Sequence, residues 1–125
     1  MSIEDPIARR VAENRWFWLL LLKLGPDRGH DEETADRIQR AHLAHLFELE
    51  AEGKLRMFGP VLDAGELRGI GVVTVPTRAE AESLMADDPA VLAGRLVLEI
   101  RPWFTKPGAA LPLDGAPEPD DGAEA

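Results

Sequence analysis

The amino-acid sequence predicts an α+β domain with the ferredoxin-like order β-α-β-β-α-β. Four apolar-rich segments have the length of strands, and two segments between them have the pattern of helices. Glycine, proline and aspartate separate these segments where turns are expected. At 125 residues the chain fits one domain. Right-handed crossovers then give a four-stranded antiparallel sheet with both helices on one face.

The first strand is predicted from Trp16 to Leu24, and the turn residues Gly-Pro-Asp at 25–27 end it. A long helix should begin near Asp31, because acidic residues there complement the positive end of the helix dipole. Either Asp31 or Thr34 could cap it by accepting from free amides. No glycine or proline follows until Gly53, which occupies the position of a helix C-terminal cap.

Two short apolar segments, Lys54–Val61 and Leu67–Val75, are predicted to form a hairpin. The connection at 63–66 contains Asp63, which we interpret as a turn residue rather than a catalytic one. Gly69 and Gly71 lie within the second of these strands and do not continue into a helix, so they are no dinucleotide-binding fingerprint. We therefore expect no nucleotide cofactor.

A second helix is predicted over Arg78–Ala86, with Thr77 and Glu80 spaced as a capping box. The last strand is predicted from Arg95 to Phe104, because apolar residues alternate there with Glu99, Arg101 and Trp103.

The two ends of the chain differ from this domain, which we place at residues 15–105. Residues 1–14 are polar and are expected to form an arm or a short helix. Residues 106–125 contain four prolines, three glycines and five acidic residues without periodicity, and are expected to be a disordered acidic tail.

The charge and the residue types exclude several classes of protein. The formal charge of −9, without a basic cluster, argues against a nucleic-acid-binding protein. The apolar run at 16–22 is far shorter than the roughly 20 residues that cross a bilayer, and it lacks the cleavage site of a secretory signal. The chain contains no cysteine, which suits a reducing compartment, so a cytoplasmic protein without membrane contact is expected.

The first predicted strand carries one feature that a single subunit does not explain. Residues 16–22 are apolar at every position, so both faces of the strand favour burial, whereas the helices cover only one. A second copy of the chain packing on the bare face would close a dimeric α/β barrel, and we expect this homodimer. An edge strand covered by the arm at 1–14 is the alternative.

Two of the three histidines lie three residues apart on the long helix. At about 100° per residue, His42 and His45 share a stripe with Ile38 and Leu49 that should face the sheet. Three interpretations stand: buried structural histidines, a metal site that would need further ligands, and acid–base chemistry. His30 precedes the helix, and no Glu-x-x-His spacing supports a metal, so no metal is predicted.

Short motifs recur in order along the chain. They are Lys-Leu-Gly-Pro at 23–26, Ala-His-Leu-Ala-His-Leu at 41–46, Glu-Gly-Lys-Leu at 52–55, Gly-Pro at 59–60, Leu-Arg-Gly-Ile at 67–70, Asp-Asp-Pro-Ala-Val at 87–91, Ala-Gly at 93–94 and Arg-Pro-Trp-Phe at 101–104. With these motifs the chain, from about Trp16 to Phe104, resembles the YCII-related (YciI-like) family. The resemblance implies a dimeric α/β barrel and a site built around a histidine and an aspartate. The matching positions are His42 and Asp88, with His45 in a supporting position.

Further candidates for contact with a small-molecule ligand follow from their positions. Gly59 and Pro60 would end or bend a strand near the site, unless they form an ordinary bulge. Arg101 and Trp103 share a strand face and would line a pocket or pair across a dimer interface.

Three functions stay open at this point. The first is a small cofactor-independent enzyme in which His42 and Asp88 move a proton on a small organic molecule, as a lyase, an isomerase or a hydrolase. Members of the family have been linked to the removal of chloride from hydroxylated aromatics, which favours a lyase. The second is a non-catalytic dimeric module that binds a small ligand or supports a partner protein. The third is a structural adaptor that uses the acidic tail as its interaction segment.

Overall fold

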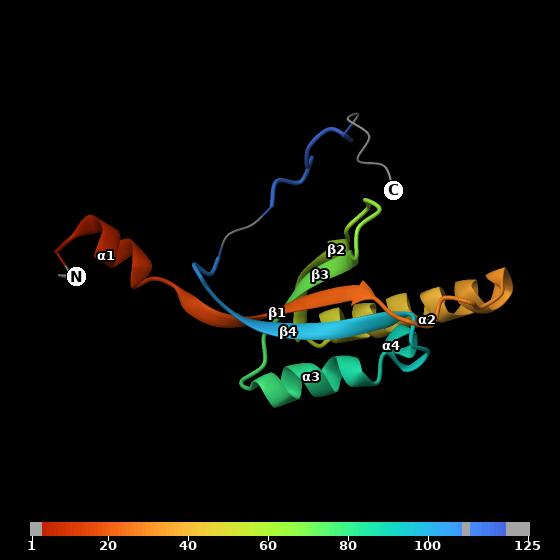
Figure 1. Ribbon diagram of the computed structural model, residues 1–125. Coiled ribbons are helices and arrows are strands. Elements are labelled where there is room, and N and C mark those ends of the chain that lie inside the picture. The colour runs from red at the N-terminus through yellow and green to blue at the C-terminus, as the bar shows by residue number, and fades with distance from the viewer. Residues whose placement is uncertain (1–3, 109–110, 120–125) are drawn as a thin grey trace.

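The computed structural model describes residues 4–108 and 111–119 of the chain. The predicted α+β class and its ferredoxin-like order are confirmed (Figure 1). The elements are α1 (Pro6–Val11), β1 (Arg15–Leu24), α2 (Glu32–Ala51), β2 (Leu55–Pro60), β3 (Leu67–Val73), α3 (Arg78–Ala86), α4 (Pro89–Leu92) and β4 (Leu96–Thr105).

The four strands form one antiparallel sheet in the order β2-β3-β1-β4. The apolar strand β1 therefore lies in the interior of the sheet, between β3 and β4. Because β1 is antiparallel to both neighbours, its end at Leu24 meets the beginning of β3 at Leu67 and the beginning of β4 at Leu96. Loops from three distant parts of the sequence are gathered at this end of the sheet.

Local signals explain the bounds of the two long helices. Asp31 caps α2 by accepting from the backbone N–H of Thr34 at 2.7 Å. Bonds from Thr34, the side chain first and then the backbone, lower the pKa of Asp31 below its usual value. Gly53 follows α2 with a φ of 75°, as its predicted capping role requires. The capping box of Thr77 and Glu80 is present at the start of α3.

The structure corrects the prediction at two places. A short helix, α4, follows Asp88 directly, where the sequence indicated only a connection. Strand β3 ends at Val73 rather than Val75. The carbonyl group of Val75 instead accepts from the indole N–H of Trp18 at 3.1 Å, so the chain leaves the sheet to cover that ring.

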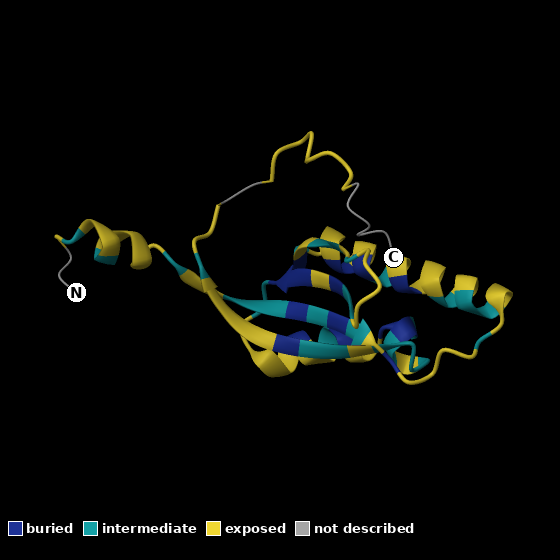
Figure 2. Ribbon diagram, turned by 45° about the horizontal axis from the view of Figure 1, so that its top comes forward, coloured by how far each residue is buried: buried dark blue, intermediate teal, exposed yellow. Residues whose placement is uncertain are grey.

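The core lies between the sheet and the helices α2 and α3. Its members come from one face of the strands and the inner stripe of each helix, and they are Leu20, Leu22, Leu46, Leu49, Leu55, Val73, Ala81, Met85 and Ile100. Figure 2 shows the opposite sides of the helices largely exposed.

The other face of the sheet has no helix on it. Residues that pair directly in an antiparallel sheet point to the same face, and the partners of Leu19 are Val72 on β3 and Arg101 on β4. Phe17 pairs with Trp103 in the same way. This open face, defined by these five residues and their strand neighbours Leu21 and Glu99, is apolar over most of β1.

The ends of the chain lie outside this two-layer body. Helix α1 lies beyond the end of the sheet (Figure 1). In the predicted tail, residues 106–108 and 111–119 are exposed and form no helix or strand. The rest of the disorder prediction concerns 109–110 and 120–125, which lie outside the described residues. Across the described ranges, the structure contains no helix with the length and apolarity needed to span a membrane.

A close backbone contact holds the loop after β1 against the turn before β4. The amide of Gly25 donates to the carbonyl oxygen of Arg95 at 2.8 Å, and the amide of Asp27 donates to Gly94 at 2.9 Å. A Cβ atom on Gly25 would lie 2.2 Å from the carbonyl oxygen of Gly94, so only glycine fits there. We call this contact the loop clamp.

We expect Gly25→Ala to lower the free energy of unfolding by about 2–4 kcal/mol, because two backbone segments must separate to admit the methyl group. Urea denaturation measures this change. The control is Gly29→Ala, where an added Cβ would meet nothing within 4 Å and the change should stay within about 0.5 kcal/mol. Equal stability of the two variants would contradict the loop clamp.

Candidate functional site

A cavity of about 500 Å³ lies between α2 and the end of the sheet where the loops gather. This volume is in the range of sites for small organic ligands. Its lining comes from α2, β1, β2, β3, the start of α4 and the start of β4.

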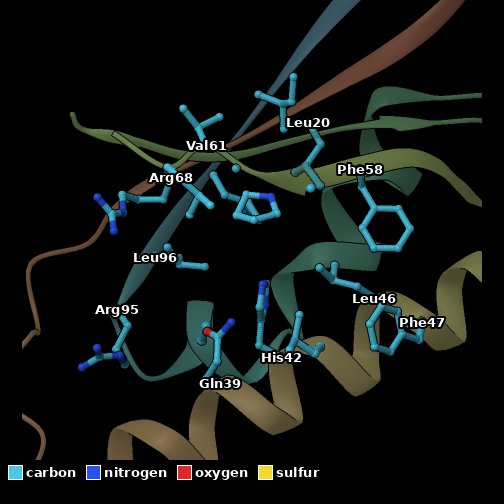
Figure 3. A pocket seen from close by; sticks show the side chains of 18 of the residues that line it. Leu20, Gln39, His42, Leu46, Phe47, Phe58, Val61, Arg68, Arg95 and Leu96 are labelled. Atoms are coloured by element: carbon cyan, nitrogen blue, oxygen red, sulfur yellow. The ribbon is translucent and has the colours of Figure 1, made fainter. Parts of the chain in front are cut away.

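His42 lies on the inner stripe of α2 and borders this cavity (Figure 3). Its side chain is buried, and its Nδ1 atom lies 2.9 Å and 2.8 Å from the two carboxylate oxygens of Asp88. Asp88 is fully buried. The structure therefore joins the two residues that the sequence singled out, across 46 positions of the chain.

Asp88 has a second task, as the N-terminal cap of α4. Its Oδ2 atom accepts from the backbone amides of Ala90 at 3.0 Å and Val91 at 3.3 Å. Pro89 favours this start, because proline lacks an amide hydrogen and its φ suits the first helical position. The two backbone amides at the start of α4 therefore hold the carboxylate in place, and the carboxylate is the acceptor in both hydrogen bonds.

The contact with Asp88 decides which ring nitrogen of His42 carries the hydrogen. Because the carboxylate is an acceptor towards both amides, Nδ1 of His42 donates and Nε2 of the neutral ring has a free lone pair. Nε2 has no hydrogen-bond partner among the described residues, and no fully buried side-chain nitrogen or oxygen there lacks one. Nε2 is therefore accessible to solvent, and the side from which it is accessible is the cavity that His42 lines.

An imidazole held in this way can both take and return a proton. The carboxylate fixes the orientation of the ring and stabilises the imidazolium that forms when Nε2 is protonated. This is the arrangement of a general base that becomes a general acid in the next step.

One side of the cavity is aromatic. The rings of Phe47 on α2 and Phe58 on β2 are 6.1 Å apart between centroids and tilted by 50°. Gly71 on β3 leaves room for this wall, since a Cβ atom there would lie 3.1 Å from Cβ of Phe58. Gly59 and Pro60, which the sequence proposed, line the cavity next to Phe58.

The other side is basic. Arg28 from the loop after β1, Arg68 on β3 and Arg95 before β4 all line the cavity. A guanidinium nitrogen of Arg28 donates to the carbonyl oxygen of Arg95 at 2.6 Å. A guanidinium nitrogen of Arg95 donates to Nδ1 of His30 at 3.1 Å, so the third histidine supports this arginine. We call these three arginines the arginine cluster.

Three residues that the sequence offered for the site do not line this cavity. The Nε2 atom of His45 is 2.8 Å from the carbonyl oxygen of Leu84, so this ring connects α2 to α3. Arg101 and Trp103 lie on the open face of the sheet. Arg101 forms an ion pair there with Glu99, which Lys23 also contacts at 2.6 Å. Hydrogen bonds from Lys23 and then Arg101 lower the pKa of Glu99 below its usual value.

The arginine cluster and the phenylalanine pair were not singled out from the sequence. A signal for the arginines exists: in this sheet order β1 ends where β3 and β4 begin, and each arginine lies at one of those three points. The phenylalanines look like ordinary core residues until the cavity is seen. Within the described ranges, no group of three or more His, Cys, Asp or Glu side chains is placed to hold a metal ion.

Comparisons with known proteins identify the family. The family model of the YCII-related domain matches residues 17–104. The chain belongs to the YCII-related family. A relative in this family, the uncharacterized protein YjpA of Bacillus subtilis (strain 168), is 32% identical over 90 residues, which cover 72% of this chain and 98% of YjpA.

A solved structure with the same fold is similar to this YCII-related chain. It is 5-chloro-2-hydroxyhydroquinone dehydrochlorinase (TftG) from Burkholderia phenoliruptrix AC1100, in complex with 2,5-dihydroxybenzoquinone. The two share 25% identity with a TM-score of 0.51, over 68% of this chain and 92% of TftG.

In this YCII-related domain we expect Asp88→Ala to lower the free energy of unfolding by about 2–4 kcal/mol, because the cap of α4 is lost and the buried ring of His42 loses its partner. Asp88→Asn keeps one carbonyl oxygen as acceptor and should cost about half as much. Chemical denaturation measures both values.

The matched control is Asp87→Ala, one residue earlier, where the side chain is exposed and the change should stay within about 0.5 kcal/mol. If Asp88→Ala were as stable as this control, the carboxylate would not hold the site together.

Proposed function

We propose that this protein is a small cofactor-independent enzyme that uses His42 and Asp88 for acid–base chemistry on a small organic molecule. The reaction is of the lyase, isomerase or hydrolase type. The observation that carries the proposal is the state of the His42 ring: one nitrogen is held by a buried carboxylate, and the other opens into a cavity of ligand size.

In the proposed mechanism, Nε2 of His42 removes a proton from a carbon or oxygen atom of the bound substrate. The electron pair left behind expels a leaving group in an elimination, or shifts a double bond in an isomerisation. Asp88 stabilises the imidazolium while it exists, and Nε2–H then returns the proton to the product or to the leaving group. Every proton is accounted for by the His42 ring.

The relatives support a reaction on a small molecule. TftG, which shares the fold, is named as a dehydrochlorinase and holds a dihydroxybenzoquinone. Loss of HCl from a hydroxylated ring needs a base for the proton, which is the role proposed for His42. An aromatic wall formed by Phe47 and Phe58 suits a flat ring of this kind.

The experiment compares the wild-type protein with His42→Asn on a set of small hydroxylated aromatics that begins with 5-chloro-2-hydroxyhydroquinone. Loss of the acid–base group should lower kcat/KM by about 10²–10⁴-fold. Steady-state kinetics, together with circular dichroism to verify folding, measure the effect.

The matched variant is His45→Asn, one turn further along α2, whose ring is engaged by Leu84 outside the cavity. We expect kcat/KM of this variant to change by less than about threefold. Equal activity of wild-type protein and a folded His42→Asn variant would refute the mechanism. Binding without turnover in both would favour a non-catalytic ligand-binding module.

The proposal includes a homodimer that closes an α/β barrel through the open face of the sheet. Leu19 and Phe17 point to this face, and Trp103 on it is 37% exposed. An apolar surface of this kind is covered in most stable proteins, and a second copy of the same face is the simplest cover. Arg101 and Trp103 then serve the interface, which is one of the two roles expected for them.

We expect light scattering after size exclusion to give the mass of a dimer for the wild-type chain, and the mass of a folded monomer for Leu19→Lys, which places a charge in the interface. Leu92→Lys is the control, because Leu92 lies on α4 with 71% of its surface exposed. A wild-type monomer at micromolar concentration would contradict the barrel.

A further inference from the structure

We propose that the cavity recognises an oxyanion of its ligand, a carboxylate or a phosphate, through the arginine cluster of Arg28, Arg68 and Arg95. The ligand class is then a small acid with an apolar or aromatic body. The inference rests on the proposed function in one respect, namely that the bound acid is also the substrate on which His42 acts. The binding of the anion is a property of the arginines and is tested separately.

The cluster is produced by the fold rather than by neighbouring positions in the sequence. Its members come from the loop after β1, from the beginning of strand β3 and from the turn before β4, which meet at one end of the sheet. The loop clamp at Gly25 and Gly94 holds the loop after β1 against the turn before β4. This contact places Arg28 against the backbone of Arg95.

The guanidinium groups of the cluster have no ion-pair partner within the part of the chain that the structure describes. None of the ion pairs among the described residues includes Arg28, Arg68 or Arg95. Arg28 and Arg68 contact backbone carbonyl oxygens, and Arg95 contacts a histidine. Acidic side chains of α2 border Arg95 in a shallow groove outside the cavity, and none forms an ion pair with it.

Other arginines among the described residues, such as Arg40 and Arg56, also form no ion pair, so the lack of a partner is not special to the cluster. What distinguishes Arg28, Arg68 and Arg95 is that all three line one cavity. Partial burial, and then the charges of Arg95 and Arg68, lower the pKa of Arg28 below its usual value. Three like charges around one cavity repel one another, and a bound anion would remove that cost.

The cavity is polarised in a way that orients such a ligand. Figure 3 shows Arg68 and Arg95 on one side, Phe47 and Phe58 on the opposite side, and His42 between them. An acid whose oxyanion lies against the guanidinium groups would direct its apolar body towards the phenylalanines. The atoms between its two ends would then lie over Nε2 of His42.

The test measures binding of three probes of similar size to the full chain by NMR titration: benzoate, phenyl phosphate and neutral benzamide. We expect at least one anion to bind about tenfold more tightly than benzamide, because charge-assisted bonds to guanidinium require the negative charge. The two anions separate a carboxylate site from a phosphate site.

Variants locate the binding. Arg68→Gln and Arg95→Gln should each weaken the preferred anion by about tenfold and leave benzamide unchanged, whereas Arg68→Lys should retain part of the affinity. The charge-matched control is Arg40→Gln, because Arg40 is exposed and lies on the side of α2 opposite His42. The affinity of this control should stay within about twofold of the wild type.

Two results would overturn the inference: benzamide binding as tightly as both anions, or Arg40→Gln weakening the anion as much as the cavity variants. His42→Asn should still bind the anion. A variant that loses turnover but still binds the anion reports on the role of His42. A variant that loses the preference for the anion but keeps turnover reports on the arginine cluster. The two proposals can therefore fail separately.

Discussion

The candidate site depends on the carboxylate of Asp88, which connects helices α2 and α4. It begins α4 by accepting two backbone amides, and it holds the ring of His42 on α2 from a fully buried position. A buried carboxylate is costly unless its oxygens are satisfied, and here every contact satisfies it. These hydrogen bonds offset the cost of burying the charge of Asp88. They also occupy Nδ1 of His42, so Nε2 is the ring nitrogen that faces the cavity.

The fold supplies the rest of the site through the direction of its strands. Since β1 ends where β3 and β4 begin, side chains far apart in the sequence surround one end of the sheet. Glycine at 25 and 94 lets the loops approach closely enough to share hydrogen bonds, and glycine at 71 makes space for the aromatic wall. The residues of the candidate site are thus positioned by close contacts that a side chain at these glycines would prevent.

Local patterns were sufficient to predict most elements, because caps act within one turn: Asp31, Gly53 and Thr77 each have the predicted role. Helix α4 was missed, since its four residues, of which the first is a proline, are too few to show periodicity. The pairing of His42 with Asp88 followed from a family resemblance and a shared sheet face, whereas the arginine cluster needed the order of the strands. Alternation placed Arg101 and Trp103 on one face together, but it does not tell whether a cavity or an open surface lies there.

The two faces of the sheet differ in whether their charges are satisfied. On the open face, Glu99 forms ion pairs with both Lys23 and Arg101, so each charged side chain of this group has a partner of opposite charge. In the cavity, the guanidinium groups of Arg28, Arg68 and Arg95 have no carboxylate partner among the described residues. Charged side chains that have a partner within their own subunit are easier to cover at an interface, whereas charged side chains without a partner suit a site that a ligand enters and leaves. This contrast supports placing assembly on one side of the sheet and chemistry on the other.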